Sequence, residues 1–330
     1  MKFESRRFLV IAFIASCLAA GGGLQNAHAQ TAFPSSPVTM VVPYPPGGGT
    51  DFFARTVAVK MGEKLGQSVI VENKPGAATA IGALDVARAK PDGLRILLGD
   101  TATFAANSSI YKKLPYDTLR DFTPISLTGR FTLVLVTNPQ VLPYNSVAEL
   151  VAAARKAPGT INYATSGAGN PFHLATAMFE RSAGISLTHV PYKGAGPAVQ
   201  DLLGGQIGMM FLDYATARAQ LASGKLKALA VASPTPHPSL PGVPTIAASY
   251  PGFEAWAWQG LVAPTGTPRP AMTRLREAYF AAINDPLVRQ KIVDAGIEPL
   301  QSSGEQMDTY VRSEIAKWSK LVTEANIHLD

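Results

Sequence analysis

The segment at residues 43–51, Pro-Tyr-Pro-Pro-Gly-Gly-Gly-Thr-Asp, lies directly between a strand pattern and a helix pattern. The apolar run 38–42 before it predicts a buried strand, and Thr50 or Asp51 can cap the helix that follows. A strand that turns through glycines into a helix directs backbone N–H groups and the positive helix end towards one point. The segment therefore predicts an anion-binding loop. It contains no Lys or Arg, so amides and hydroxyls would make the first contacts.

The N-terminal residues have the pattern of an export signal. A basic start at 2–7 precedes the apolar run 8–20, and residues 27–29, Ala-His-Ala, form a small-x-small cleavage site. We expect cleavage before Gln30 and export to the periplasm. The paired arginines of the basic start also fit a twin-arginine signal, so the sequence leaves the export route open.

The only cysteine, Cys17, lies inside this signal. The exported chain would therefore have no disulfide, thiolate nucleophile or cysteine metal site. Anchoring as a lipoprotein at Cys17 is the alternative to cleavage before Gln30, although the apolar run continues past Cys17 to the alanine site. The chain has a net charge of +6, but its charges are scattered without a basic run or interleaved aromatic residues, which argues against nucleic-acid binding.

Strand and helix patterns alternate through most of the chain, which predicts α/β units built on parallel sheets. Strands are expected at 38–42, 68–72, 94–98, 132–137, 161–163, 187–190, 207–212 and 226–231. Small-residue loops follow strand ends at 43–51, 76–79, 99–103, 165–171, 191–196 and 213–214. Ligands of open α/β sheets bind at the carboxyl ends of the strands, so two such lobes would enclose a cleft. Segments 121–130 and 233–268 would cross between the lobes, and the tail 269–327 reads as mostly helical.

Eight motifs occur in order along the exported chain: VPYPPGGGTD at 42–51, VENKPGA at 71–77, PDG at 91–93, HL at 173–174, HVPYKGAGPA at 189–198, LLGGQ at 202–206, PGVPT at 241–245 and WQGLVAP at 258–264. With these motifs the chain resembles the solute-binding proteins of tripartite tricarboxylate transporters, the Bug family. Each motif alone is weakly specific, whereas the ordered set is highly specific.

The resemblance implies a two-lobed α/β periplasmic-binding-protein fold, similar to type II, in which each lobe is a mostly parallel sheet flanked by helices. Residues 30–131 and 255–330 would form one lobe and 132–254 the other. The implied function is to capture a small aliphatic di- or tricarboxylate, or an aromatic carboxylate, in the cleft between the lobes. The protein would act as a monomer without a cofactor and deliver the ligand to the membrane subunits of the transporter.

The same resemblance implies ligand contacts from the first strand-to-helix loop and from its counterpart in the second lobe. The candidates are Tyr44, Pro46, Gly47, Gly48, Thr50, Asp51, Thr165, Ser166, Ala168 and Gly169. Thr165 and Ser166 could equally cap the following helix.

Three further candidates come from other loops. Thr79 falls where this chain departs from the family, with Gly-Ala-Ala-Thr-Ala at 76–80 in place of the commoner Gly-Ala-Gly-Gly-Asn. Thr101 is a weaker candidate, since a threonine at a strand end is more often a cap. Asp213 ends a strand that faces the cleft, where it would cap the next turn or accept from a donor on the ligand.

Other functions have less support in the residues. A metal site is not predicted because no two histidines have metal-ligand spacing. An exported hydrolase lacks a nucleophile elbow, since Ser166 is not in a Gly-x-Ser-x-Gly sequence. His173 and His189 are expected to be structural, and Trp256 and Trp258 to pack in the core or hinge, or to stack on a ligand ring. A sensor subunit that presents the ligand to a signalling receptor would need the same binding lobes as a transport protein.

Overall fold

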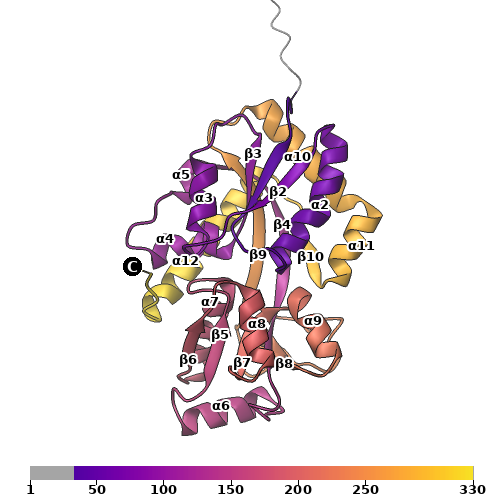
Figure 1. Ribbon diagram of the computed structural model, residues 1–330. Helices are drawn as coiled ribbons and strands as arrows, with labels where there is room; N and C mark the ends of the chain where they lie inside the picture. The colour runs from indigo at the N-terminus through magenta and orange to yellow at the C-terminus, as the bar shows by residue number, and fades with distance from the viewer. Residues whose placement is uncertain (1–32, 330) are drawn as a thin grey trace, which may run out of the picture. The chain divides into compact units, whose positions relative to one another are not determined.

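One long strand, β4 (Phe122–Thr137), belongs to both sheets of the structure (Figure 1). As far as Thr132 it pairs with β9 (Trp256–Pro264), and from Leu133 onward it pairs with β7 (Met209–Asp213). The change of partner between Thr132 and Leu133 therefore divides the strand between two lobes.

This computed structural model describes residues 33–329. The predicted export signal, with Cys17 and the cleavage site before Gln30, lies outside the described residues. Within the described part of the chain, no helix has the length and apolarity needed to cross a membrane.

The first sheet runs in the order β2 (Val69–Asn73), β1 (Val38–Val42), β3 (Arg95–Asp100), β9 and β4, with β10 (Ile297–Pro299) also paired to β4. The second contains β4, β7, β5 (Asn162–Thr165) and β6 (Thr188–Pro191), with β8 (Lys227–Val231) also paired to β4. The pairs of β1 with β2 and β3, and of β5 with β6 and β7, are parallel. Strands β4 and β9 run antiparallel to their neighbours, so both sheets are mixed.

Helices cover each sheet, and we call each sheet with its helices a lobe. The first lobe carries α2 (Gly49–Leu65), α3 (Ala80–Ala87), η1 (Ala102–Ala106), α4 (Asn107–Ile110), α5 (Thr118–Asp121), α10 (Arg269–Asn284), α11 (Pro286–Asp294) and α12 (Gly304–Glu324). The second carries α6 (Val147–Lys156), α7 (Pro171–Ala183), α8 (Ala195–Leu203) and α9 (Tyr214–Ala222), with the short η2 (Ile246–Ala248) in the return segment. Helix α2 packs against α10 and α11, and α12 packs against α4 and η1.

Local sequence explains where several helices begin and end. Ser146 caps α6 by accepting from the N–H of Glu149, as a serine before an apolar helical pattern predicts. Ser303 and Gln306 form a reciprocal capping box at the start of α12. Helix α2 ends at Gly66, whose left-handed conformation (φ 76°) favours glycine.

The predicted crossover at 121–130 differs from the structure: Asp121 ends α5, residues 122–130 form the first part of β4, and the change of partner falls between Thr132 and Leu133. The strand pattern is hidden by Pro124 and Gly129, and the pairing with β9 shifts register near both residues. Such bulges interrupt the alternation by which a strand is recognised in sequence. The return crossover 233–268 likewise contains β9. The proposed lobe boundaries at 131/132 and 254/255 remain a prediction, which the partner change along β4 supports.

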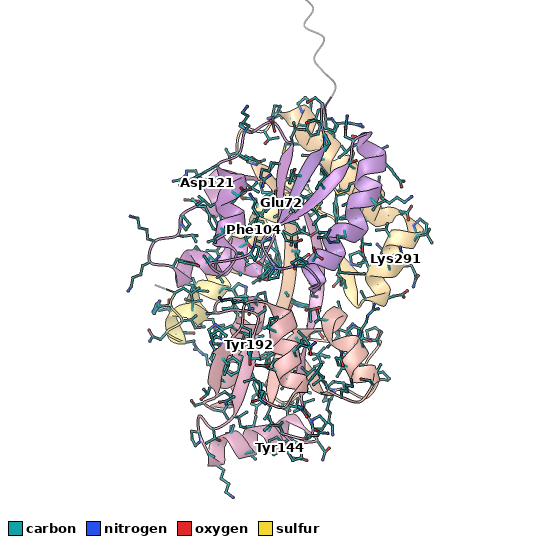
Figure 2. All side chains as sticks on the ribbon, in the orientation of Figure 1. Glu72, Phe104, Asp121, Tyr144, Tyr192 and Lys291 are labelled. Atoms are coloured by element: carbon teal, nitrogen blue, oxygen red, sulfur yellow. The ribbon has the colours of Figure 1, made fainter. Side chains whose placement is uncertain are left out.

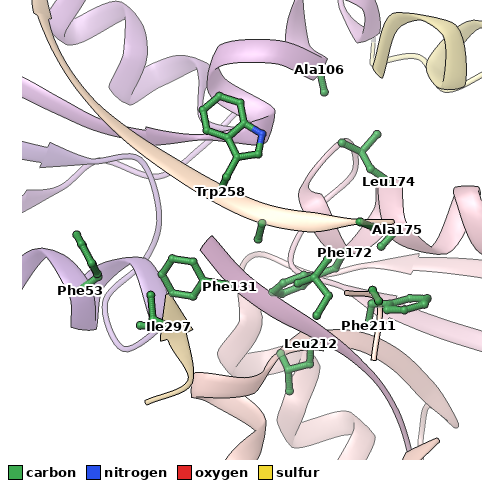
Figure 3. Close-up of a cluster of buried hydrophobic side chains, with 14 of the residues drawn as sticks. Phe53, Ala106, Phe131, Phe172, Leu174, Ala175, Phe211, Leu212, Trp258 and Ile297 are labelled. Carbon is green, nitrogen blue, oxygen red and sulfur yellow. The ribbon is translucent and has the colours of Figure 1, made fainter. Parts of the chain in front are cut away.

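Buried side chains continue from one lobe into the other along β4. Figure 3 shows Phe53 and Trp258 of the first lobe, Phe131 of β4, and Phe172 and Phe211 of the second lobe within one apolar cluster. The rings of Phe53 and Phe131 meet edge to face at a centroid distance of 6.4 Å. The core therefore ties the ends of both sheets to the place where the lobes meet.

Trp258 of β9 is fully buried. Its ring stacks on Phe104 at 6.1 Å, and its Nε1–H donates to Glu314 Oε2 at 2.7 Å. Trp318 Nε1–H donates to the same oxygen at 2.7 Å. Of the two readings for this tryptophan, core packing is therefore the one observed, and a single buried carboxylate satisfies two buried indoles.

We expect Glu314→Ala to lower the free energy of unfolding by roughly 2–4 kcal/mol, because it leaves two buried indole N–H groups without an acceptor. Urea denaturation followed by tryptophan fluorescence measures the loss. Asp308→Ala, which removes an exposed ion pair with Arg312 on the same helix, should cost less than about 1 kcal/mol. Equal losses in the two variants would contradict this account of the core.

Candidate functional site

A cavity of about 110 Å³ lies where the two lobes meet, and we call it the cleft cavity. Loops and strand ends of both lobes line it. From the first lobe come Tyr44, Pro45, Pro46, Gly48, Gly49, Thr50, Asp100, Phe131, Ala257 and Gln259, and from the second come Ser166, Pro171, Phe172, Gly194, Ala195, Gly196, Pro197 and Asp213. The lining is mainly apolar and contains no Lys or Arg among the described residues.

Two helices from opposite lobes begin at this cavity without a side-chain cap. Helix α2 follows Gly48 and helix α8 follows Gly194, and neither N-cap makes a side-chain hydrogen bond. The N–H groups of a first helical turn have no partner inside the helix and carry a partial positive charge. Because both helix starts line the cavity, backbone N–H groups without a side-chain cap reach it from each lobe; in α8 these belong to Ala195 and Gly196, since Pro197 has no N–H.

The predicted cap of α2 by Thr50 or Asp51 is wrong, because the helix begins at Gly49 and Gly48 is the N-cap. The Asp51 carboxylate is already engaged by the Gly47 N–H at 3.0 Å, by Arg55 at 2.9 Å and by Asn73 at 3.0 Å. Although burial acts to raise it, these bonds hold the pKa of Asp51 below its usual value. Asp51 therefore fixes the loop from behind and leaves the start of α2 open.

Tyr44 lines the cleft cavity with its hydroxyl hydrogen already committed. Its O–H donates to Asp100 Oδ2 at 2.6 Å. Asp100 Oδ1 accepts from the N–H of Thr103 at 3.1 Å and from its hydroxyl at 2.9 Å. Burial raises the pKa of the Asp100 carboxyl and, together with the charge of Asp100, the pKa of Tyr44. The Tyr44 oxygen can therefore accept a hydrogen bond from a ligand.

Asp213 reaches the cavity from the end of β7. It caps α9 by accepting from the Thr216 N–H at 2.9 Å, and burial raises its pKa. A methyl group on Gly49 would come within 2.9 Å of Asp213 Oδ1 and of the Phe131 ring. The second-lobe carboxylate is thus packed closely against the start of the first-lobe helix α2.

Gln259 of β9 adds an amide to the same wall. Its Nε2 donates to the Thr50 hydroxyl, and its buried Oε1 has no hydrogen-bond partner. Thr50 accepts this bond through its oxygen, so its own hydroxyl hydrogen stays available to a ligand.

The structure places six of the thirteen candidate residues on the lining: Tyr44, Pro46, Gly48, Thr50, Ser166 and Asp213. The other seven, Gly47, Asp51, Thr79, Thr101, Thr165, Ala168 and Gly169, lie outside it. Asp100 and Gly194 also line the cavity. They belong to strand-end loops that the sequence marks, but they are not among the thirteen candidate residues. Gln259 and Phe131 carry no such signal. Gln259 lies within the predicted crossover 233–268, and Phe131 lies between the predicted crossover 121–130 and the predicted strand 132–137.

The three threonines outside the lining support the loops from behind. Thr79 bonds to Thr103 Oγ1 at 3.0 Å, Thr101 Oγ1 accepts from the Trp258 N–H at 3.2 Å, and Thr165 Oγ1 lies 2.7 Å from His189 Nε2. All three threonines are buried. A direct ligand contact from any of them stays a prediction.

A second cavity, of about 480 Å³, adjoins the first and shares Tyr44, Pro45, Ser166 and Gly194 with its lining. Tyr192 lines it close to where the lobes meet (Figure 2). So does the turn 77–79, whose residues Ala77, Ala78 and Thr79 have φ angles of 45°, 44° and 78°. Such left-handed conformations cost L-residues with a side chain roughly 1–2 kcal/mol each, which glycine would avoid.

His173 and His189 stack beneath the 165–170 loop, with ring centroids 4.0 Å apart. His173 Nδ1 accepts from the Gly169 N–H at 3.0 Å, which requires an unprotonated nitrogen. Burial lowers the pKa of His173 to about 3, helped by the neighbouring His189, and burial lowers the pKa of His189 to about 4. Both histidines hold the loop from behind, as the expectation of a structural role predicts.

Comparison with known proteins identifies the family. The pattern of the "Tripartite tricarboxylate transporter family receptor" matches residues 53–327. The chain belongs to this family. Its members are solute-binding proteins and not enzymes. Protein BugT of Bordetella pertussis is 34% identical over 322 residues, 97% of this chain and 98% of BugT. A UPF0065 protein encoded between tcbD and tcbE in Pseudomonas sp. strain P51 is 39% identical over 305 residues, 92% of this chain and 90% of the relative.

Solved structures share the fold of this receptor. The periplasmic binding protein BugD has a TM-score of 0.85 and 37% identity, covering 90% of this chain and 99% of BugD. Rpa4515 of R. palustris, solved with adipate, has a TM-score of 0.86 and 34% identity over 90% of this chain and 99% of its own. MatC (Rpa3494) of Rhodopseudomonas palustris, solved with malate, has a TM-score of 0.83 and 33% identity over 88% and 100%. The mixed α/β periplasmic-binding-protein fold is therefore confirmed.

The buried histidines predict a loss of stability in acid. A histidine whose folded-state pKa lies below its unfolded value of about 6.5 stabilises the fold above that pH, and the contribution falls as the pH drops toward the folded pKa. Between pH 6.5 and pH 5, the free energy of unfolding of the unmodified protein should therefore fall by up to about 2 kcal/mol more than that of His173→Gln. Urea denaturation of both proteins at pH 7.5, 6.5 and 5 measures the difference. Parallel pH profiles would contradict this role.

The tight contact at the start of α2 predicts that Gly49→Ala lowers the free energy of unfolding by about 1–3 kcal/mol through overpacking against Asp213 and Phe131. Gly48→Ala is the matched control, since a methyl group there meets no atom within 4 Å, and it should cost less than about 1 kcal/mol. Urea denaturation of both variants provides the test. If Gly49→Ala cost no more than Gly48→Ala, the close approach of the lobes at Gly49 would be disproved.

Proposed function

We propose that this protein binds a small carboxylate in the cleft cavity and delivers it to the membrane subunits of a tripartite tricarboxylate transporter. One observation carries the proposal: helices α2 and α8, from opposite lobes, both begin uncapped at the same cavity. A carboxylate supplies the acceptor oxygens that such helix starts lack. Family membership supports transport, and relatives solved with adipate and malate support a carboxylate.

The donors for the carboxylate would be the first-turn N–H groups of the two helices, together with the hydroxyls of Thr50 and Ser166. A hydrogen bond to a charged group contributes roughly 1.5–3 kcal/mol. A few such bonds, less the cost of ordering the ligand and the loops, correspond to about −8 kcal/mol and a micromolar Kd. Because only six of the candidate residues line the cleft cavity, we assign direct ligand contact to these six and a supporting role to the other seven.

Binding would be coupled to closure of the lobes. A ligand held by both helix starts stabilises the arrangement that brings them together, which shifts the population toward the closed form. Strands β4 and β9 connect the lobes, and bending of these strands would open the cavity. The closed surface would then be recognised by the transporter in the periplasm, after removal of the signal before Gln30.

We expect Gly48→Asp to abolish carboxylate binding. The introduced carboxylate has room at this position and would itself cap α2, so it occupies the anion site without unfolding the protein. Isothermal calorimetry with adipate, succinate and malate should show at least a tenfold loss of affinity. Gly48→Asn, which caps the helix without a charge, separates the two effects and should retain more affinity.

The wider test is a thermal-shift screen of residues 30–330 against carboxylates and neutral sugars. The proposal predicts that at least one carboxylate raises the melting temperature. It fails if a neutral sugar raises the melting temperature and no carboxylate does, or if Gly48→Asp binds the selected carboxylate as tightly as the unmodified protein.

A further inference from the structure

The cleft cavity holds more hydrogen-bond acceptors than a site for a simple anion needs. Its lining includes the carboxyl groups of Asp100 and Asp213 and the side-chain amide of Gln259, with no Lys or Arg among the described residues. A bare carboxylate would meet the helix N–H groups but would also face these oxygens without a cation between them.

Asp100 already has its donors. Its Oδ2 accepts from Tyr44 at 2.6 Å, and its Oδ1 accepts from the N–H and the hydroxyl of Thr103. All of these donors belong to the first lobe, so Asp100 is satisfied without a ligand. Its effect on the cavity is indirect: it fixes the hydroxyl hydrogen of Tyr44 and leaves that oxygen as an acceptor.

Asp213 is short of donors. Its Oδ1 accepts from the N–H of Thr216 at 2.9 Å. The Thr216 hydroxyl lies 3.0 Å from Oδ1 and 2.9 Å from Oδ2, but one hydroxyl hydrogen can serve only one of them at a time. Apart from the backbone N–H of Asp213 itself, Oδ2 thus has at most this shared donor among the described residues, although the Asp213 side chain is buried.

Gln259 provides the second, independent observation. The residue is 2% exposed and lines the cavity, yet its Oε1 has no partner. A buried amide oxygen without a donor costs about 1–3 kcal/mol. Reversing the amide would not remove the deficit. The oxygen would then lie beside Thr50, and the nitrogen would lie without an acceptor at the unpartnered position.

We propose that the ligand of this receptor carries a hydrogen-bond donor, a hydroxyl or an ammonium group, on the carbon next to its carboxylate, and that Asp213 and Gln259 receive it. The inference rests on the proposed function. The spacing follows from the Asp213 carboxylate as a whole: its Oδ1 packs closely against Gly49, so Oδ2, the other oxygen of the same group, also lies near the helix start that would hold the ligand carboxylate. The substrate class is therefore a 2-hydroxy or 2-amino carboxylic acid.

The alternative role for Asp213 is only to cap α9. An N-cap requires an acceptor and not a charge, and asparagine serves as well as aspartate. Asp213→Asn therefore keeps the cap while it removes the negative charge and introduces N–H groups towards the ligand donor. Asp285→Asn is the matched control: Asp285 caps α11 by accepting from the N–H groups of Leu287 and Val288, and it does not line the cleft cavity.

The experiment is calorimetry of the protein from Gln30 onward with two matched sets of acids: succinate, malate and aspartate, and glutarate, 2-hydroxyglutarate and glutamate. We expect a donor-bearing acid to bind at least tenfold more tightly than the bare acid of the same length. A preference for the amino acids identifies an ammonium donor, and a preference for the hydroxy acids a hydroxyl donor. Asp213→Asn should reduce this preference at least fivefold, whereas Asp285→Asn should leave it unchanged.

Three results would overturn the inference, and they have different consequences for the proposed function. If the bare acids bind as tightly as their hydroxy and amino derivatives, or if Asp213→Asn keeps the full preference, the donor subsite is absent while carboxylate binding stands. If no carboxylate of any kind binds, the proposed function fails and the inference with it. Thermal melting of both variants establishes that they are folded, so a loss of binding is not mistaken for unfolding.

Discussion

In the described part of the chain no side chain caps the start of helix α2, and the proposed role of the cleft depends on the N–H groups left open there. A glycine N-cap supplies no side-chain acceptor, and the nearest carboxylate of the same loop, Asp51, is held by Gly47, Arg55 and Asn73. The start of a 17-residue helix is therefore left open. Helix α8 presents a second open start from the other lobe, so an anion that satisfies both must lie between the lobes.

The neighbouring helices show that this openness is a local property and not a general one. Helix α7 is capped by Asn170, and α9 is capped by Asp213. Asp213 has a double role, because the same side chain satisfies α9 and faces the start of α2. Its position brings a carboxyl group next to the proposed anion site, which a ligand with both a carboxylate and a donor would accommodate. Affinity and selectivity would then reside in different groups of one small cavity.

Much of the fold is predictable because its elements are local. The strand patterns at 38–42 and 94–98 are rich in β-branched and leucine residues, and the serine before α6 marks its start. The first half of β4 is not predictable in this way, because Pro124 and Gly129 interrupt its strand pattern. It forms a strand because it pairs with β9, which is distant in sequence. The strand signal is thus lost in the part of β4 that pairs within the first sheet, just before the chain passes to the second lobe.

For the site, the sequence by itself determined which loops carry it: the glycine-rich turn after β1 and the small-residue loops after other strands. Only the tertiary structure decided which residues of those loops face the cavity. Thr79, Thr101 and Thr165 turn their hydroxyls to the supporting layer. By contrast, Gln259 enters from a strand within the predicted crossover 233–268, and Phe131 lies just before the predicted strand 132–137. The physical reason is that a loop's position follows from local backbone chemistry, while the direction of a side chain depends on partners distant in sequence.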